Sequence, residues 1–92
     1  MERIQTLHPE AGKQGVTITR EKYDIVRAAV LDALANGPLT LAALLEDVTQ
    51  RLPAGFDGKP GWYMMSLKLD LEARGVIERV PKASPQQVRL KS

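Results

Sequence analysis

The stretch from residue 61 to residue 80 constrains the fold of this chain more than any other segment. Its first part, residues 61–74, places Met64, Leu67 and Leu71 at i, i+3 and i+7, which predicts a helix with one core-facing stripe. Gly75 follows, at the point where a helix C-terminus needs a residue that tolerates positive φ. Residues 76–80 then hold three β-branched side chains, which predicts a strand directly after the helix.

The chain continues with a turn and a second extended run. The turn is residues 81–85, bounded by prolines, and residues 86–91 follow with Val88 and Leu90 in alternation. Helix, glycine, strand, turn and strand in this order form the C-terminal half of a winged helix-turn-helix. Bacterial winged-helix regulators join the recognition helix to the wing in a similar way, and the resemblance is carried by Leu67-x-x-x-Leu71-x-x-x-Gly75-Val76-Ile77-Glu78-Arg79.

Two further helices are predicted upstream. One covers residues 20–35, with Thr19 as N-cap and Gly37 and Pro38 as the stop. The other covers residues 41–52 with Thr40 as N-cap, and residues 39–40 are expected to pair with the wing as a third strand. Phe56 is expected to pin the loop before the last helix. We therefore predict an α+β fold, mainly α: a winged helix-turn-helix domain over residues 19–92, with three helices and a C-terminal two-stranded β-hairpin wing.

Residues 1–18 are interpreted as an N-terminal arm. Pro9 and two glycines break any helical run there, while residues 16–18 have the composition of a short strand. Because Ile4 and Leu7 are apolar, part of the arm is expected to pack on the domain.

Composition limits the function classes. The chain has 92 residues and no cysteine, which fits one domain without disulfides, thiolate metal sites or cysteine nucleophiles. The N-terminus carries no apolar run, so we expect neither a signal peptide nor a membrane span, and a cytoplasmic location.

No set of residues predicts an enzyme, a cofactor site or a metal site. His8 is the one histidine, and a surface or hydrogen-bonding role is expected for it. The carboxylates Asp57, Asp70 and Glu72 are expected on a solvated loop or helix face, without a nucleophile and base beside them.

The charge is distributed unevenly along the chain. Residues 61–92 hold six Lys and Arg against three Asp and Glu, and most of the excess lies in the predicted wing. Basic side chains on a wing beside a recognition helix are suited to phosphate contact, although a purely solubilising role is an equal alternative. The candidate nucleic-acid-binding residues are Lys59, Ser66, Lys68, Arg79, Lys82 and Arg89.

The last helix argues against simple groove binding. The side opposite its core stripe is mostly apolar, whereas base and phosphate contacts need polar or basic side chains. Three explanations stay open: the arm covers this side through Ile4, Leu7, Val16 or Ile18; a second copy or a protein partner covers it; or it contacts DNA directly. A wrongly phased helix, with these residues in the core, is a fourth. The candidate partner-binding residues are Trp62, Met65 and Leu69.

The chain as a whole resembles a group of small, uncharacterised bacterial winged-helix-like proteins. The resemblance covers residues 3–80 and is carried by Ile4-Gln5-Thr6-Leu7-His8-Pro9, Gly12-Lys13-x-Gly15, Tyr23, Gly37-Pro38-Leu39-Thr40, Phe56-Asp57-Gly58, Gly61-Trp62-Tyr63 and Lys68-Leu69-Asp70-Leu71-Glu72-Ala73-Arg74-Gly75. It implies a stand-alone winged-helix domain and no particular activity. We expect a dimeric transcription regulator that binds double-stranded DNA; the alternative is a module for protein interaction or homodimerisation that does not bind DNA.

Overall fold

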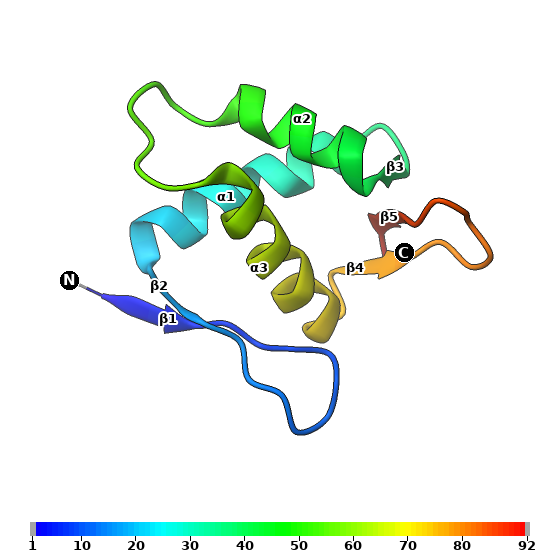
Figure 1. Ribbon diagram of the computed structural model, residues 1–92, viewed down its shortest axis with the longest axis horizontal. Coiled ribbons are helices and arrows are strands. Elements are labelled where there is room, and N and C mark those ends of the chain that lie inside the picture. The colour runs from blue at the N-terminus through cyan, green and yellow to red at the C-terminus, as the bar shows by residue number, and fades with distance from the viewer. Residues whose placement is uncertain (1, 92) are drawn as a thin grey trace.

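The computed structural model describes residues 2–91 and shows a mainly helical α+β fold (Figure 1). Three helices pack together, with α1 behind α2 and α3 in the view of Figure 1, and two small antiparallel sheets flank them. Along the chain the elements are β1 (Arg3–Gln5), β2 (Thr17–Thr19), α1 (Arg20–Leu34), β3 (Leu39–Thr40), α2 (Leu41–Arg51), α3 (Pro60–Ala73), β4 (Ile77–Arg79) and β5 (Gln87–Leu90).

Local signals set the helix ends. Thr40 caps α2, because its side chain accepts a hydrogen bond from the N–H of Ala43 at 3.1 Å. At the end of α3, Gly75 has a φ of +75°, as its place in the sequence predicted. Its N–H donates to the carbonyl of Glu72, and the next N–H, of Val76, donates to that of Leu71. These two hydrogen bonds form a Schellman motif, which ends the helix and directs the chain into β4.

The sheets join segments that are distant in sequence. In the first sheet β1 pairs with β2, with Ile4 opposite Ile18. In the second the strand order is β3-β5-β4, and Val88 lies opposite Leu39. The predicted pairing of residues 39–40 with the C-terminal strands is therefore confirmed. Strands β4 and β5 are shorter than predicted, and β2 begins one residue after the predicted start at residue 16. Strand β1 was not predicted at all.

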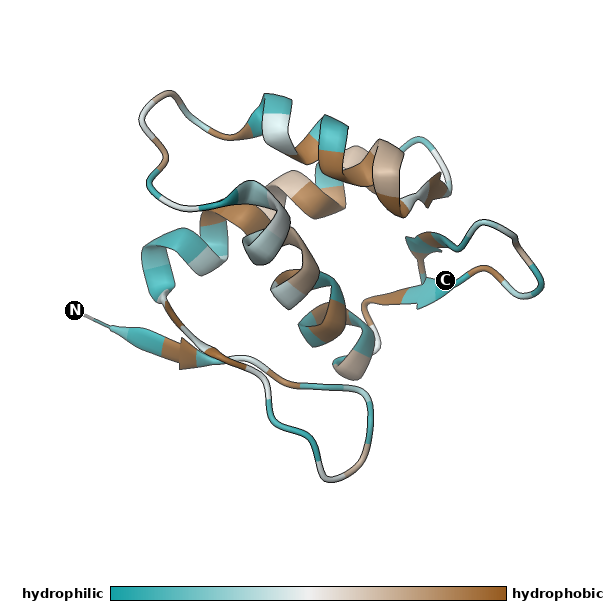
Figure 2. Cartoon of the chain, viewed as in Figure 1, coloured by the Kyte–Doolittle hydropathy of each residue, from teal (hydrophilic) through white to brown (hydrophobic). Residues whose placement is uncertain are grey.

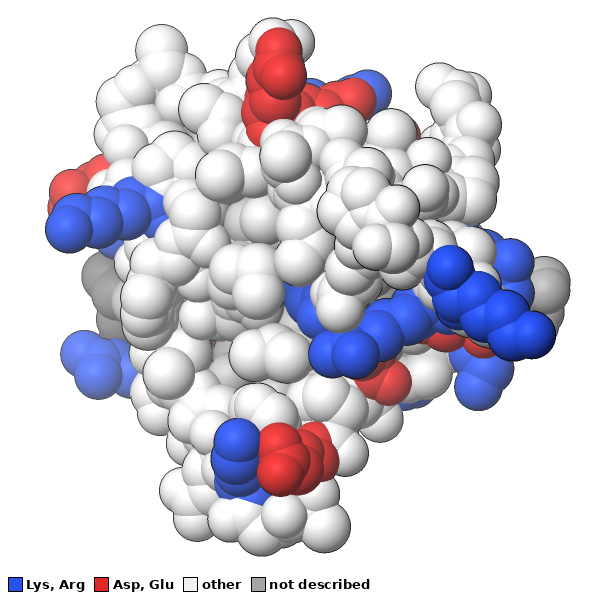
Figure 3. All heavy atoms as spheres, turned by 45° about the vertical axis from the view of Figure 1, so that its right-hand side comes forward, with Lys and Arg blue, Asp and Glu red and all other residues white. Residues whose placement is uncertain are grey.

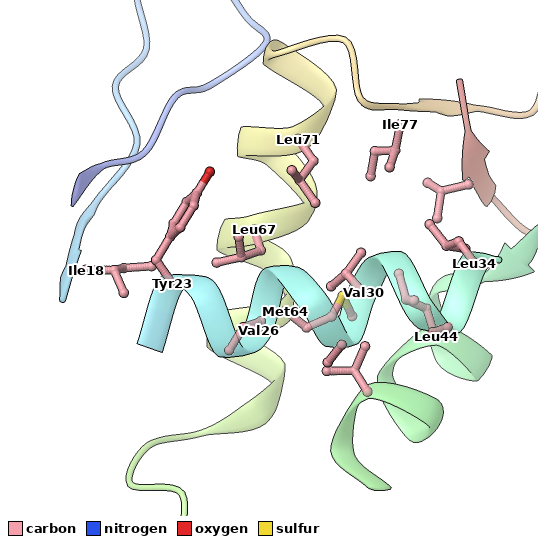
Figure 4. Close-up of a cluster of buried hydrophobic side chains, with 14 residues drawn as sticks. Ile18, Tyr23, Val26, Val30, Leu34, Leu44, Met64, Leu67, Leu71 and Ile77 are labelled. Atoms are coloured by element: carbon pink, nitrogen blue, oxygen red, sulfur yellow. The ribbon is translucent and has the colours of Figure 1, made fainter. Parts of the chain in front are cut away.

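The core lies where the three helices meet the second sheet (Figure 4). Val30 from α1, Leu44 from α2, Leu67 from α3 and Val88 from β5 are all fully buried. Burying a side chain of this size contributes about 1.5–3 kcal/mol. Figure 2 shows the result as alternating hydrophilic and hydrophobic bands along the helices. None of the helices in the described part of the chain is long and apolar enough to cross a membrane.

Candidate functional surfaces around helix α3

The first half of the outer face of α3 is open to solvent. Trp62 is 48% exposed and Met65 is 37% exposed, while Leu69 and Ala73 further along are half-buried. The core stripe Met64, Leu67 and Leu71 is buried as predicted. The phase of the helix is therefore correct, and the explanation that places Trp62 in the core is wrong.

The loop before α3 is held by aromatic contacts. The rings of Phe56 and Tyr63 meet edge to face with centroids 5.3 Å apart, so the expectation that Phe56 pins the loop is confirmed. On the other side of Tyr63 lies the indole of Trp62, with centroids 4.9 Å apart. The ammonium of Lys22 lies 5.5 Å from the Tyr63 ring centroid. These contacts fix the start of α3 and the direction in which Trp62 is presented.

The N-terminal arm covers the second half of the same face. The backbone N–H of Leu7 donates to Oδ1 of Asp70 at 2.8 Å. The arm residues Thr6 and Leu7 also border a small cavity of about 100 Å³ that is bordered on the α3 side by Ser66 and Leu69. The explanation in which the arm covers this side of α3 therefore applies at Leu69. The arm does not cover Trp62 and Met65, which are exposed.

Asp70 is the centre of a buried polar cluster. Its carboxylate is fully buried; Oδ2 accepts a hydrogen bond from the hydroxyl of Tyr23 at 2.6 Å. Nε of Arg74 donates to Oδ1 and Oδ2 at 2.9 and 3.0 Å. The expectation that Asp70 lies on a solvated helix face is wrong, because these donors and the N–H of Leu7 replace water around the charge.

The cluster shifts the ionisation of its neighbours. Burial raises the pKa of Tyr23 above its ordinary value, and the hydrogen bond to Asp70 and the negative charge of that carboxylate raise it further. The hydrogen bond to Asp70 likewise raises the pKa of Arg74. Figure 4 shows the hydroxyl of Tyr23 pointing out of the apolar cluster. The arrangement joins α1, α3 and the arm through one carboxylate.

A second charge cluster joins α3 to β4. Lys68 is only 2% exposed, and its Nζ lies 2.8 Å from Oε1 of Glu72. Oε2 of Glu72 lies 3.6 Å from Nε of Arg79. The solvated position expected for Glu72 is therefore wrong, since its side chain is 11% exposed. The nucleic-acid contact predicted for Lys68 also needs correction, because a buried ammonium paired with a carboxylate does not reach a phosphate.

The remaining predicted basic residues are exposed. We call residues 77–91, which contain β4, β5 and the turn between them, the C-terminal strand pair. Arg79 is 62% exposed at its side chain, and Arg89 is 42% exposed while its Nε contacts Glu78 at 2.8 Å. Lys82 and Lys91 are exposed, and within residues 2–91 neither has an ion-pair partner. Figure 3 shows Lys and Arg atoms gathered on this side of the molecule.

Two predicted contact residues lie on α3 or next to it. Lys59 is exposed immediately before the first residue of the helix. Ser66 is half-buried, and its hydroxyl donates to the carbonyl of Trp62 at 2.9 Å. The predicted nucleic-acid residues therefore fall into three groups: an exposed basic group on the C-terminal strand pair, Lys59 exposed just before α3, and two residues within α3. The latter two, Ser66 and Lys68, are occupied by contacts within the helix.

A comparison with protein-family models matches residues 3–88 to a family of unknown function, DUF6958. The chain belongs to that family. The DUF6958 match includes β1 and the first half of β5, so it spans the arm from Arg3, the three helices and the C-terminal strand pair as far as Val88. Comparisons with curated proteins and with solved structures gave no significant match.

A groove of this DUF6958 protein lies between the arm and the end of α3. It measures about 490 Å³ and is lined mainly by arm residues, with Ala73 from the helix. His8 lies in this lining, and its Nδ1 accepts a hydrogen bond from the N–H of Glu10 at 3.0 Å, the hydrogen-bonding role expected for it. Among residues 2–91 no three His, Cys, Asp or Glu side chains are grouped as metal ligands.

Proposed function

We propose that the chain is a small winged-helix protein that holds double-stranded DNA through the C-terminal strand pair. Support for the winged-helix assignment comes from the order of elements: α1, β3, α2, α3, β4 and β5, with β3 paired to β5. In winged-helix domains the short strand before the second helix pairs with the wing in this way. The C-terminal strand pair is then the wing, and α3 is the helix beside it.

The exposed basic group carries the proposal. Lys82 and Lys91 offer ammonium groups that pair with no acidic side chain in the described chain, and Arg79 and Arg89 use only Nε in their ion pairs. Each arginine therefore keeps further N–H donors for a phosphate. Four cations on one exposed strand pair suit the backbone of a duplex, whose charge dominates protein–DNA affinity.

Helix α3 has a smaller part in this proposal than a recognition helix usually has. Its exposed residues Trp62 and Met65 are not among the side chains that usually read base edges, and Lys68 is buried. We therefore expect binding that depends on phosphate contacts and only weakly on base sequence. The regulatory role rests on the resemblance of residues 61–80 to winged-helix regulators.

Charge reversal tests the proposal. The variant Lys82→Glu/Lys91→Glu is compared with Arg3→Glu/Lys13→Glu, which changes the net charge equally at exposed positions of the arm. Binding of a labelled duplex is followed by fluorescence anisotropy at low salt. The strand-pair variant should lose roughly tenfold or more in affinity, because two phosphate contacts become repulsive, while the arm variant stays near the wild type. Equal losses in both variants, or none in either, would show that the strand pair is not the DNA surface.

The exposed aromatic side chain favours a second candidate, a protein-interaction or homodimerisation module. Trp62 is nearly half exposed beside Met65, and tryptophan is enriched at interface hot spots. In this case Trp62→Ala abolishes concentration-dependent association measured by light scattering. A wild-type chain that stays monomeric at every concentration, with DNA affinity unchanged in Trp62→Ala, would favour the first candidate.

A further inference from the structure

The loop that connects β1 to β2 forms a strap over α3. We define the strap as residues 6–16; it runs past the C-terminal half of the helix (Figure 1). Thr6 is its one buried residue, whereas seven of its members are exposed, namely Leu7 and all of residues 9–14. A segment with so little buried surface belongs to the low-stability end of a fold, where parts open without global unfolding.

The strap is closed on itself at its base. The N–H and the hydroxyl of Thr6 both donate to the carbonyl of Val16, at 2.8 and 2.9 Å. In return the hydroxyl accepts a bond from the N–H of Val16 at 2.7 Å. Gly15 lies against this closure, and a Cβ on it would come 2.2 Å from Oγ1 of Thr6 and 2.4 Å from its carbonyl oxygen. The strap therefore keeps its own shape and is suited to move as one unit.

Its attachment to α3 is narrow. The N–H of Leu7 donates to Asp70, and strap residues line a small cavity with Leu69 and a larger groove with Ala73. The bond to Asp70 comes from the backbone of the strap, so it requires the position of Leu7 rather than its side chain. One charge-assisted hydrogen bond between two open spaces acts as a latch.

We propose that the strap is a lid that opens as a unit and controls access to the second half of the α3 outer face. With the lid closed, Trp62 and Met65 are exposed, whereas Leu69 and Ala73 are half-buried. With it open, Leu69 and Ala73 join them in a continuous apolar stripe, since these four residues lie on one side of the helix. This inference concerns the fold itself and does not depend on DNA binding.

The test uses the absence of cysteine in the chain. A single reporter thiol, Leu69→Cys, is placed under the lid, and Met65→Cys serves as the matched control on the open half of the face. Each is combined with Gly15→Ala, which forces the base of the strap apart. Gly15→Ala should raise the labelling rate of Leu69→Cys about tenfold, which corresponds to a decrease of about 1.4 kcal/mol in the free energy of lid opening. The labelling rate of Met65→Cys should change by less than about twofold.

Hydrogen exchange on the cysteine-free chain separates lid opening from unfolding. The N–H of Leu7 should exchange at least tenfold faster in Gly15→Ala, while the core N–H groups of Val30 and Leu67 keep their wild-type rates. Gly12→Asn is the loop control, because Gly12 has open space and a φ of +84° that asparagine tolerates. Equal acceleration of Leu7 and the core, or a Leu69→Cys labelling rate that Gly15→Ala leaves unchanged, would overturn the proposal.

Discussion

Replacing Tyr23 with phenylalanine removes one hydroxyl from the Asp70 cluster and leaves the buried ring in place. The lost bond is 2.6 Å long and its acceptor is a fully buried carboxylate. Hydrogen bonds to charged groups contribute about 1.5–3 kcal/mol, and Oδ2 keeps the guanidinium of Arg74 at 3.0 Å, so we expect a loss of about 2 kcal/mol in the free energy of unfolding.

Asp70→Asn is the companion variant. It removes the charge and replaces one acceptor oxygen with an NH₂ donor. Because all three groups that face this side chain are donors, one acceptor for them is lost. Breaking a buried charge cluster of this kind costs about 3–5 kcal/mol. Because Tyr23 and Asp70 are in direct contact, the double variant should be less destabilised than the sum of the singles, with a coupling of about 1–2 kcal/mol.

Urea unfolding followed by circular dichroism at pH 7 gives all three values. Tyr63→Phe is the control, since the hydroxyl of Tyr63 has only a contact of 3.5 Å with Lys22. We expect the control to lie within about 0.5 kcal/mol of the wild type. Additive losses, or a Tyr23→Phe variant as stable as the control, would refute the claim that Asp70 organises this region.

Two further predictions concern stability. Thr40→Ala should cost about 1 kcal/mol in urea unfolding because its cap to Ala43 is lost, whereas Thr19→Ala should cost less, since Thr19 makes no side-chain cap bond. At alkaline pH the raised pKa of Tyr23 means that the folded chain keeps a proton that the unfolded chain releases above about pH 10. Stability is therefore full below that pH and falls as pH rises through the folded-state pKa, by up to about 1.4 kcal/mol per pH unit. In Tyr23→Phe this part of the alkaline loss should disappear when unfolding is measured between pH 9 and 11, and an unchanged loss would contradict the assignment.

The helical framework was predictable because its signals are local. Periodic apolar residues, the Thr40 cap and the positive φ of Gly75 act within a few residues of the chain, so the helix bounds agree within one residue. Strand β1 was not predictable in the same way. Its three residues carry little pattern of their own, and their pairing with β2 depends on the path of the strap.

The charged residues of α3 show why the site was harder to predict. Lys68 and Asp70 suggested a solvated face, because charge in a sequence normally indicates exposure. Each is followed four residues later by a residue of opposite charge, Glu72 and Arg74 respectively. This spacing indicates that the two residues can form an ion pair on the helix, and such a pair can be buried. What buries Asp70 is the arm, whose bonding partner Leu7 is 63 residues away in sequence, and no local pattern predicts that contact.

The salt dependence of duplex binding tests the proposed function most directly. The four cations of the C-terminal strand pair are Arg79, Lys82, Arg89 and Lys91. Two to four phosphate contacts predict a slope of log K against log salt between about −1.8 and −3.6, since each contact contributes about −0.9. Lys82→Glu/Lys91→Glu should reduce the magnitude of that slope by about 1.8, because two phosphate contacts are lost. A wild-type chain that does not bind duplex DNA at about 50 mM salt, or binds it with a slope near zero, would contradict DNA binding through the strand pair.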